Sequence, residues 1–231
     1  MTKLTISARN ILLWLLLCLG VLLILHLFGQ YLWHIQGLIH PSIYVDRFNM
    51  NEEISLPTWF ASFLLLFVSV LMGAAGSAKT QGRSAARYWK VLAVIFLFLS
   101  IDEGSSFHEV LSDPMRALLN IQSGWLYYAW VVPGAALAIA AIIYFFRFWR
   151  NLPASVRSLV GLASFLYLSG ALGVELLGTY YASAIGGYDF NYFLSVALEE
   201  SLEKLGLIIL IYALIRYLAQ FKAVWSVTFR R

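Results

Sequence analysis

This 231-residue chain is 61% hydrophobic and only 12% charged, which is too apolar for a water-soluble protein. Its formal net charge is +4, but the basic residues gather beside apolar stretches, where membrane topology explains them, so we do not expect nucleic acid as a partner. With a single cysteine, Cys18, the chain cannot form an intramolecular disulfide.

Six apolar stretches predict an all-α, polytopic membrane protein with six transmembrane helices, because each is near the ~20 residues that cross a bilayer. The predicted spans are residues 11–28, 57–76, 88–111, 125–146, 158–182 and 192–217. The first stretch is longer than a signal-peptide core, and no small-residue cleavage site follows it, so we expect a retained helix. Residues 1–231 are predicted to form one helical-bundle domain.

Charge divides this sequence between two sides. Thirteen of the sixteen Lys and Arg precede the first span or follow the second, fourth and sixth: Lys3, Arg9, Lys79, Arg83, Arg87, Lys90, Arg147, Arg150, Arg157, Arg216, Lys222, Arg230 and Arg231. The positive-inside rule therefore predicts cytoplasmic N and C termini and a periplasmic loop at about residues 29–56. All twelve Asp and Glu fall on the outer side, and Glu52 and Glu53 of the long loop are a candidate lid.

The third predicted span carries a polar stripe in its outer part. If the helix continues through residue 111, Asp102, His108 and Glu109 share one broad face, with Glu103 at its edge. Ionisable groups inside a membrane segment are costly and usually functional. Of the other histidines, we expect His26 to be a hydrogen-bonded core residue and His34 and His40 to lie in the outer loop.

Two further spans bring carboxyl groups to the same predicted depth. Glu175 lies among small residues that allow close helix approach, so we expect it to point into the bundle. Glu199 and Glu203 are four residues apart and should share a helix face, and Lys204 is placed to pair with Glu200. Seven carboxyl groups in a low-dielectric site need protons, cations or water.

The leading hypothesis is a periplasm-facing cation site, with a divalent metal supporting chemistry on a lipid-soluble or periplasmic substrate. Carboxylates with one imidazole suit iron, manganese or zinc, whereas carboxylates alone suit calcium. The predicted ligands or proton carriers are Asp102, Glu103, His108, Glu175, Glu199 and Glu203. The predicted supporting or charge-balancing residues are Glu109, Glu200 and Lys204.

Two other classes remain open, and the sequence does not decide whether the protein is an enzyme. A proton- or cation-coupled transporter or channel would need an inner path, for which the sequence offers serines such as Ser62, Ser69 and Ser164. A non-catalytic subunit or assembly factor would use the polar groups to hold helices together. The expected partners are the lipid bilayer, a lipid or small-molecule ligand and membrane-protein subunits. Aromatic residues such as Tyr128 are expected in an outer interfacial belt.

The sequence resembles a class of bacterial polytopic inner-membrane proteins from the second span onward. The resemblance rests on three motifs: Glu53-Ile54-Ser55-Leu56-Pro57-Thr58-Trp59-Phe60, which opens a helix; Ser100-Ile101-Asp102-Glu103 with His108-Glu109; and Leu198-Glu199-Glu200 with Glu203. It implies a multi-pass protein of a bacterial inner membrane and carries no reaction with it.

Overall fold

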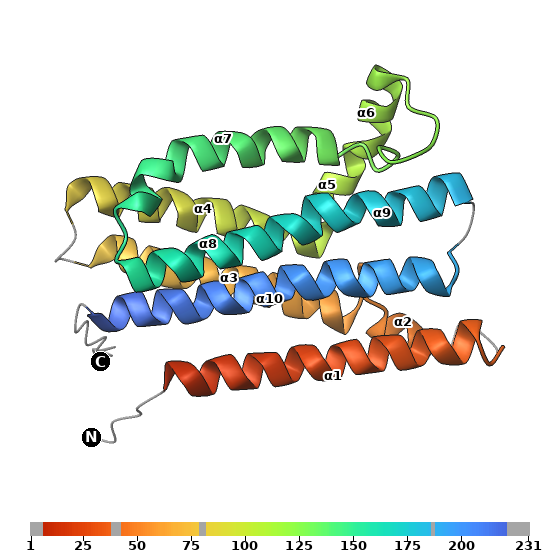
Figure 1. Ribbon diagram of the computed structural model, residues 1–231, viewed down its shortest axis with the longest axis horizontal. Helices are drawn as coiled ribbons and strands as arrows, with labels where there is room; N and C mark the ends of the chain where they lie inside the picture. Colours follow the sequence, from red (N-terminus) through yellow and green to blue (C-terminus); the bar gives the residue numbers. More distant parts are fainter. Residues whose placement is uncertain (1–6, 38–42, 79–81, 186–187, 221–231) are drawn as a thin grey trace, which may run out of the picture.

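The computed structural model describes residues 7–37, 43–78, 82–185 and 188–220. Its long helices run nearly side by side (Figure 1). In chain order the elements are α1 (Ala8–His34), α2 (Ile43–Phe48), α3 (Leu56–Ser77), α4 (Arg83–Ser105), α5 (Phe107–Val110), α6 (Ser112–Leu119), α7 (Val131–Arg150), α8 (Ala154–Leu168), η1 (Ser169–Val174), α9 (Glu175–Tyr180), η2 (Tyr181–Ile185) and α10 (Phe190–Gln220). The all-α class is confirmed for these residues. Lys3, His40, Lys79, Lys222, Arg230 and Arg231 lie outside them.

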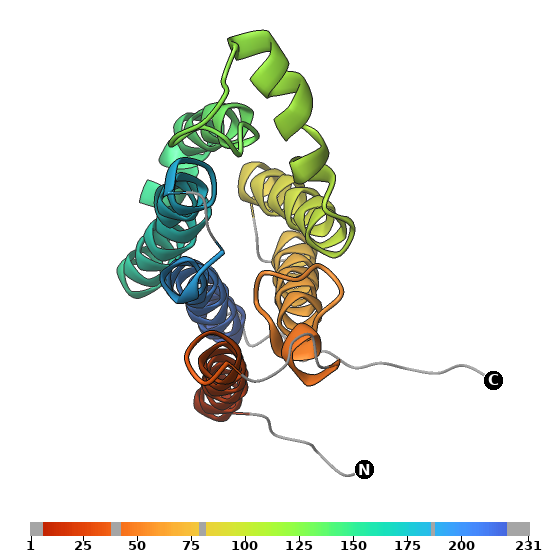
Figure 2. The same cartoon turned by 90° about the vertical axis from the view of Figure 1, so that its right-hand side faces the viewer.

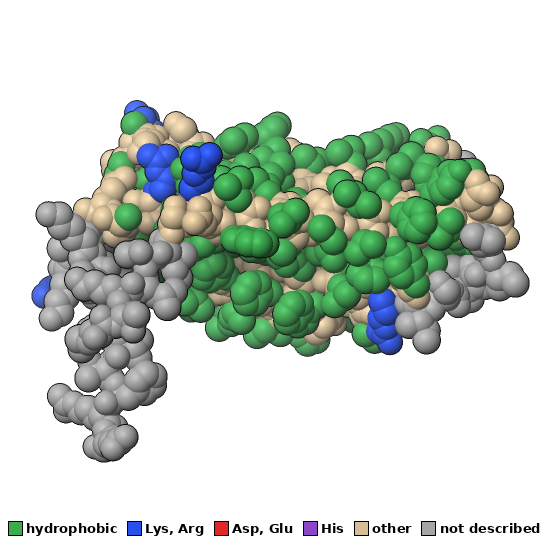
Figure 3. All heavy atoms as spheres, turned by 90° about the horizontal axis from the view of Figure 1, so that it is seen from below, with side chains coloured by type: hydrophobic (Ala, Val, Ile, Leu, Met, Phe, Trp, Pro, Cys, Tyr) green, Lys and Arg blue, Asp and Glu red, His purple; other side chains and the backbone are tan. Residues whose placement is uncertain are grey.

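Five helices in the described chain are long and apolar enough to cross a bilayer: Ala8–His34, Leu56–Ser77, Arg83–Ser105, Val131–Arg150 and Ala154–Ser183. They define a multi-pass membrane protein, and one face of the bundle is largely hydrophobic between its ends (Figure 3). α10 has 31 residues and is long enough to be a sixth span, but charged residues interrupt its apolar sequence. The count of six, the orientation of the termini and the bacterial inner membrane therefore stay predictions.

The helices form two walls when the bundle is seen end-on (Figure 2). α3 and α4 make one wall, whereas α7, α8, α10 and α1 follow one another along the other. α10 packs against α1, α3 and α8 and so links the two walls. α7 lies at the edge, where it contacts α4, α8 and η1.

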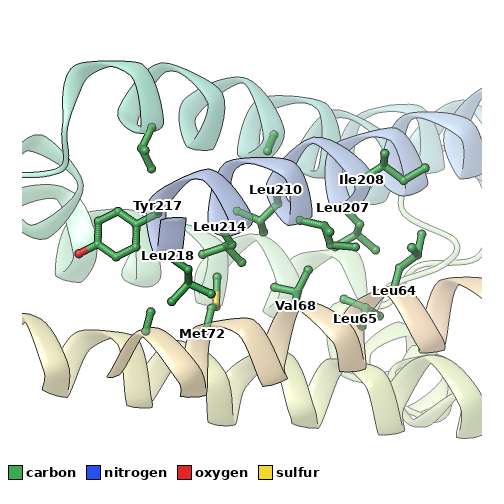
Figure 4. Packing of buried hydrophobic residues seen from close by; sticks show 14 of the residues in the cluster. Leu64, Leu65, Val68, Met72, Leu207, Ile208, Leu210, Leu214, Tyr217 and Leu218 are labelled. Atoms are coloured by element: carbon green, nitrogen blue, oxygen red, sulfur yellow. The ribbon is translucent and has the colours of Figure 1, made fainter. Parts of the chain in front are cut away.

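A tightly packed region joins α3 to α10. Leu64 and Val68 of α3 and Ile211 and Leu214 of α10 are fully buried. The Val68 and Leu214 side chains point into the space between the two helices (Figure 4). Lipid tails are as apolar as leucine, so the close fit of these side chains, rather than removal from water, holds membrane helices together.

Two glycines allow α10 to approach α8 and η1 at backbone distance. A Cβ added to Gly206 would lie 2.8 Å from the carbonyl oxygen of Ala163, and one added to Gly170 would lie 2.7 Å from that of Glu199. Neither distance is compatible with a side chain, so this interface depends on glycine as small-residue helix contacts in membranes do.

Several predicted boundaries are wrong. α1 continues to His34 instead of ending at residue 28, so the outer loop starts later and His34 belongs to the helix. α7 starts at Val131, six residues after the predicted start, because Gly124 at φ 93° and the turns that follow it delay the helix. α3 starts as the Pro-Thr-Trp motif predicts, with the Ser55 side chain accepting a hydrogen bond from the backbone N–H of Thr58 at 3.2 Å.

The third predicted span does not continue to residue 111. α4 ends at Ser105, and Ser106 adopts a left-handed conformation at φ 53° before the short helix α5. Gly104 and the two serines are weak helix formers, and the Asp102 carboxylate accepts a hydrogen bond from the backbone N–H of His108 across the break. Asp102 and Glu109 therefore do not lie on one continuous helix face.

Substitution of Gly170 by alanine should destabilise the bundle, whereas the same change at Gly173 should not. The Gly170→Ala side chain must push α10 away, and overpacking of this kind typically costs about 1–3 kcal/mol. Gly173, three residues along the same π-helical segment, has open space around its Cα. Thermal unfolding in detergent measures both variants; equal midpoints would contradict a backbone-distance contact at Gly170.

Candidate functional site

A cavity of about 1570 Å³ lies between the two walls of the bundle. α4, α7, α8 and α10 contribute most of its lining, which is apolar over much of its length and includes Phe98, Leu137, Leu168 and Leu207. The volume exceeds the ~300–1,000 Å³ of pockets for drug-sized ligands, so a lipid-sized molecule can be accommodated.

Carboxyl groups are concentrated on this cavity. Within the described chain, eleven of the twelve Asp and Glu contribute to its lining, and Arg116 is the only Lys or Arg that does. The eleven are Asp46, Glu52, Glu53, Asp102, Glu103, Glu109, Asp113, Glu175, Glu199, Glu200 and Glu203. All six residues predicted as ligands or proton carriers therefore lie at the cavity, as do Glu109 and Glu200, whereas Lys204 is not part of the lining.

The break after α4 turns His108 back onto Asp102. One carboxylate oxygen of Asp102 accepts from the backbone N–H of His108 at 2.9 Å, and the other lies 2.9 Å from Nδ1 of its ring. Burial lowers the pKa of His108, but the hydrogen bond and charge of Asp102, with Glu103 and Glu109 nearby, outweigh it and raise the pKa above its ordinary value. The backbone contact fixes the position of His108, and the ring contact at Nδ1 orients the imidazole and leaves Nε2 for other partners.

Trp130 links the histidine to a second acidic pair. Its ring meets His108 edge-on with the centroids 4.7 Å apart, and its indole N–H donates to Glu175 at 3.1 Å. The carboxyl groups of Glu175 and Glu199 are in turn hydrogen-bonded to each other. A hydrogen bond between two carboxyl groups requires a proton on one of them, since ionised carboxylates only accept.

Lys204 is fully buried and pairs with Glu200, as the four-residue spacing predicts. The charge of Lys204 also acts on Glu103 and Glu199, which lie on either side of the cavity. Glu203 is close enough to Glu103 and Glu175 for their charges to repel it. The predicted residues thus come together as neighbouring pairs.

The segment after α2 contacts the site at its α5 end. Glu53 accepts a hydrogen bond from the Ser106 hydroxyl and shares another with Glu109, so the predicted lid contacts α5. Burial, together with the charge and hydrogen bond of Glu53, raises the pKa of Glu109 to about 7.

The predicted metal ligands do not form a metal-binding group in the described part of the chain. In residues 7–37, 43–78, 82–185 and 188–220, no three His, Cys, Asp or Glu side chains form a group that could hold a metal ion. His26 is a hydrogen-bonded core residue, as predicted: its ring lies 3.3 Å from the Phe193 carbonyl oxygen and accepts from the Met50 backbone N–H at 3.1 Å.

The serines considered for an inner transport path have other partners. Ser62 donates to the Ser100 carbonyl at 2.7 Å and Ser69 to the Ala93 carbonyl at 2.7 Å, so both hold α3 against α4. Ser164 does line the cavity. These contacts favour a structural role for two of the three serines.

Two aromatic residues of the site were not assigned to it from the sequence. Trp130 bridges His108 and Glu175, and Tyr128, which was expected in an interfacial belt, lines the cavity and hydrogen-bonds to Tyr188 and Tyr192. Burial raises the pKa of the Tyr128 hydroxyl above its ordinary value. The density of aromatic residues just before α7 was the only available signal, and an interfacial anchor has the same signature.

The five long apolar helices define a multi-pass helical membrane protein. The chain belongs to a family described as a domain of unknown function (DUF8692), whose match covers residues 8–218. No curated protein and no solved structure matches the chain.

The Asp102→Asn variant should lower the pKa of His108. Asparagine keeps an acceptor for the ring but removes the charge that favours its protonated form, so burial then dominates. Nitrogen-15 NMR of labelled histidine, assigned with His108→Gln, measures the change. Asp113→Asn, which alters a carboxylate paired with Arg116, is the control. A His108 pKa that is unchanged in Asp102→Asn would show that the carboxylate does not control the ring.

Stability should fall with rising pH in a way that depends on Glu109. Its pKa is higher in the folded protein, so its contribution is complete below the unfolded value and is lost as the pH rises through about 7. Glu109→Gln should flatten the decrease in unfolding midpoint between about pH 5 and about pH 8, and Glu52→Gln should not. Parallel curves for Glu109→Gln and the unaltered protein would exclude this role.

Proposed function

We propose that the cavity holds a lipid-soluble molecule with its polar group against the carboxyl side chains, and that Asp102, His108, Glu175 and Glu199 exchange protons with that group. Such a site would serve proton-transfer chemistry on a lipid-soluble substrate. The observation that carries the proposal is the lining of the cavity, which is apolar over much of its length and carries eleven carboxyl groups.

The His108 ring supports acid–base chemistry. A histidine whose Nδ1 is held by a carboxylate presents Nε2 in a fixed direction, and a pKa near the working pH allows it to accept or donate a proton. His108 has such a partner in Asp102 and lines the cavity. General acid–base catalysis by a positioned side chain typically contributes about 10²–10⁴-fold to a rate.

The Glu175–Glu199 pair supports proton storage at the same place. Two neighbouring carboxyl groups in a low-dielectric site cannot both ionise without a large cost, so the pair keeps a proton until a cation or donor replaces it. Trp130 orients Glu175 by a 3.1 Å hydrogen bond. Its ring also touches His108, so the two proton-exchanging pairs border one region of the cavity.

Iron, manganese, zinc or calcium as the bound cation stays a separate prediction. Its ligands would be drawn from Asp102, Glu103, His108, Glu175, Glu199 and Glu203. The described side chains favour protons because no three His, Cys, Asp or Glu among them form a group that could hold a metal ion.

Native mass spectrometry and elemental analysis of one detergent-purified sample, prepared without chelator, test the proposal. We expect one bound organic molecule and substoichiometric metal. Glu175→Gln should weaken retention of that molecule by roughly tenfold to a hundredfold, the effect of losing a hydrogen bond to a charged group. Asp189→Asn, which alters the one carboxylate outside the lining and keeps an α10 capping oxygen, should not.

Two results would overturn the proposal in different ways. Near-stoichiometric iron, manganese or zinc that disappears in Glu175→Gln would replace the proton-exchanging pairs with the predicted metal centre. The absence of any bound organic molecule in the unaltered protein would contradict the ligand and favour a non-catalytic subunit.

A further inference from the structure

We infer that the ligand is a membrane amphiphile with a cationic head group, and that it reaches the cavity sideways from the bilayer through an opening between α4 and α7. This inference rests on the proposed function, because it names the class of molecule that the cavity would hold and its path.

The opening is marked by side chains that line the cavity and are nevertheless exposed. On α4 these are Val94, 67% exposed, and Phe98, 59% exposed; on α7 they are Leu137, 72% exposed, and Ile142, 54% exposed. On both helices, these side chains border the cavity and keep more than half of their surface accessible, so no neighbouring element covers them. The opening therefore lies between these two helices.

Contacts on both sides of the opening hold α4 and α7 apart at a fixed spacing. Toward the start of α4, the Tyr88 ring packs on Tyr144, Phe145 and Phe148 of α7 with centroid distances of 5.5, 5.9 and 5.1 Å. At the other end, His108 packs on Trp130 just before α7. No such aromatic contact joins the helices at Phe98 or Leu137 in the described chain.

The depth of the opening selects molecules that are already in the bilayer. Val94 and Phe98 lie six and ten residues after Tyr88, which places them about 9 and 15 Å farther along the helix. That region faces the hydrocarbon of a bilayer ~30 Å thick. A water-soluble ion cannot approach through this layer, whereas a lipid chain can.

The charge of the lining selects the head group. Eleven carboxyl groups line the cavity, and Arg116, the only Lys or Arg among the described lining residues, is paired with Asp113. His108, which also lines the cavity, is paired with Asp102. Lys204 is paired with Glu200 and is not part of the lining. An ammonium group matches this surface and can donate three hydrogen bonds to carboxylates, whereas an anionic head would be repelled.

Binding of the head group balances charge by releasing a proton. The proton shared by Glu175 and Glu199 leaves to the outer solution when an ammonium group donates to both carboxylates in its place. No bond other than these hydrogen bonds forms or breaks. Binding should therefore strengthen as the pH rises, until the amine itself loses its proton.

Radiolabelled hexadecylamine is a suitable probe, with the protein in lipid nanodiscs and empty nanodiscs as the blank. Scintillation proximity then gives both the equilibrium and the rate of association. We expect saturable binding of the amine, and binding of hexadecyl sulfate weaker by about tenfold or more, as expected from loss of charge-assisted hydrogen bonds. Equal binding of the two, or preference for the sulfate, would overturn the cationic head group.

Ala141→Trp tests the opening, because Ala141 is half-buried and lines the cavity on α7. The large side chain should slow association of hexadecylamine severalfold. Ala140→Trp places the same group on the adjacent, exposed position outside the lining and should leave the rate unchanged. Unfolding midpoints equal to that of the unaltered protein show that both variants fold.

The outcomes separate the path from the site. Equal association rates for Ala141→Trp and Ala140→Trp, with binding still lost in Glu175→Gln, would contradict the lateral opening while the proposed function stands. Slower association in Ala141→Trp alone would support the opening. Amine binding unaffected by Glu175→Gln would place the probe elsewhere and contradict both the inference and the proton-exchanging pair.

Discussion

Carboxyl groups cannot lie in a hydrocarbon layer as bare charges, and this constraint accounts for much of the arrangement around the cavity. An ionised side chain inside a membrane segment needs a counter-charge, a proton or water. The first two solutions are present here: His108 against Asp102 and Lys204 against Glu200 as counter-charges, and a carboxyl–carboxyl hydrogen bond between Glu175 and Glu199.

Most of the helices could be predicted from the sequence because crossing a bilayer is a matter of length and composition. The stretch at residues 57–76 corresponds to α3 within a residue at each end. Helix ends that depend on local hydrogen bonds were harder to predict from the sequence. The end of α4 at Ser105 depends on the left-handed conformation of Ser106 and on a hydrogen bond to the Asp102 side chain. Neither can be predicted from the hydropathy of the sequence.

The ionisable residues of the candidate site could be named from the sequence, but its aromatic residues and most of its contacts could not. The spacing of Glu200 and Lys204 on one helix is sufficient to predict their contact. The hydrogen bond between Trp130 and Glu175 joins residues 45 positions apart, and it depends on how α7 lies against η1. Asp102 and His108 meet only because the helix breaks between them, so a projection over an intact helix placed them on one face without joining them.

The π-helical segments η1 and η2 change the direction in which the side chains of the fifth predicted span point. A π turn holds one residue more than an α turn, so all side chains beyond it are rotated by about 100° relative to those before it. Glu175 follows η1 directly, and its direction toward Glu199 therefore reflects the width of that turn. Loss of a single residue from Ser169–Val174 would keep the helix and its hydrophobicity intact while turning the carboxyl group away from its neighbour. In this segment, chain length over six residues is as strict a requirement as the identity of the glutamate.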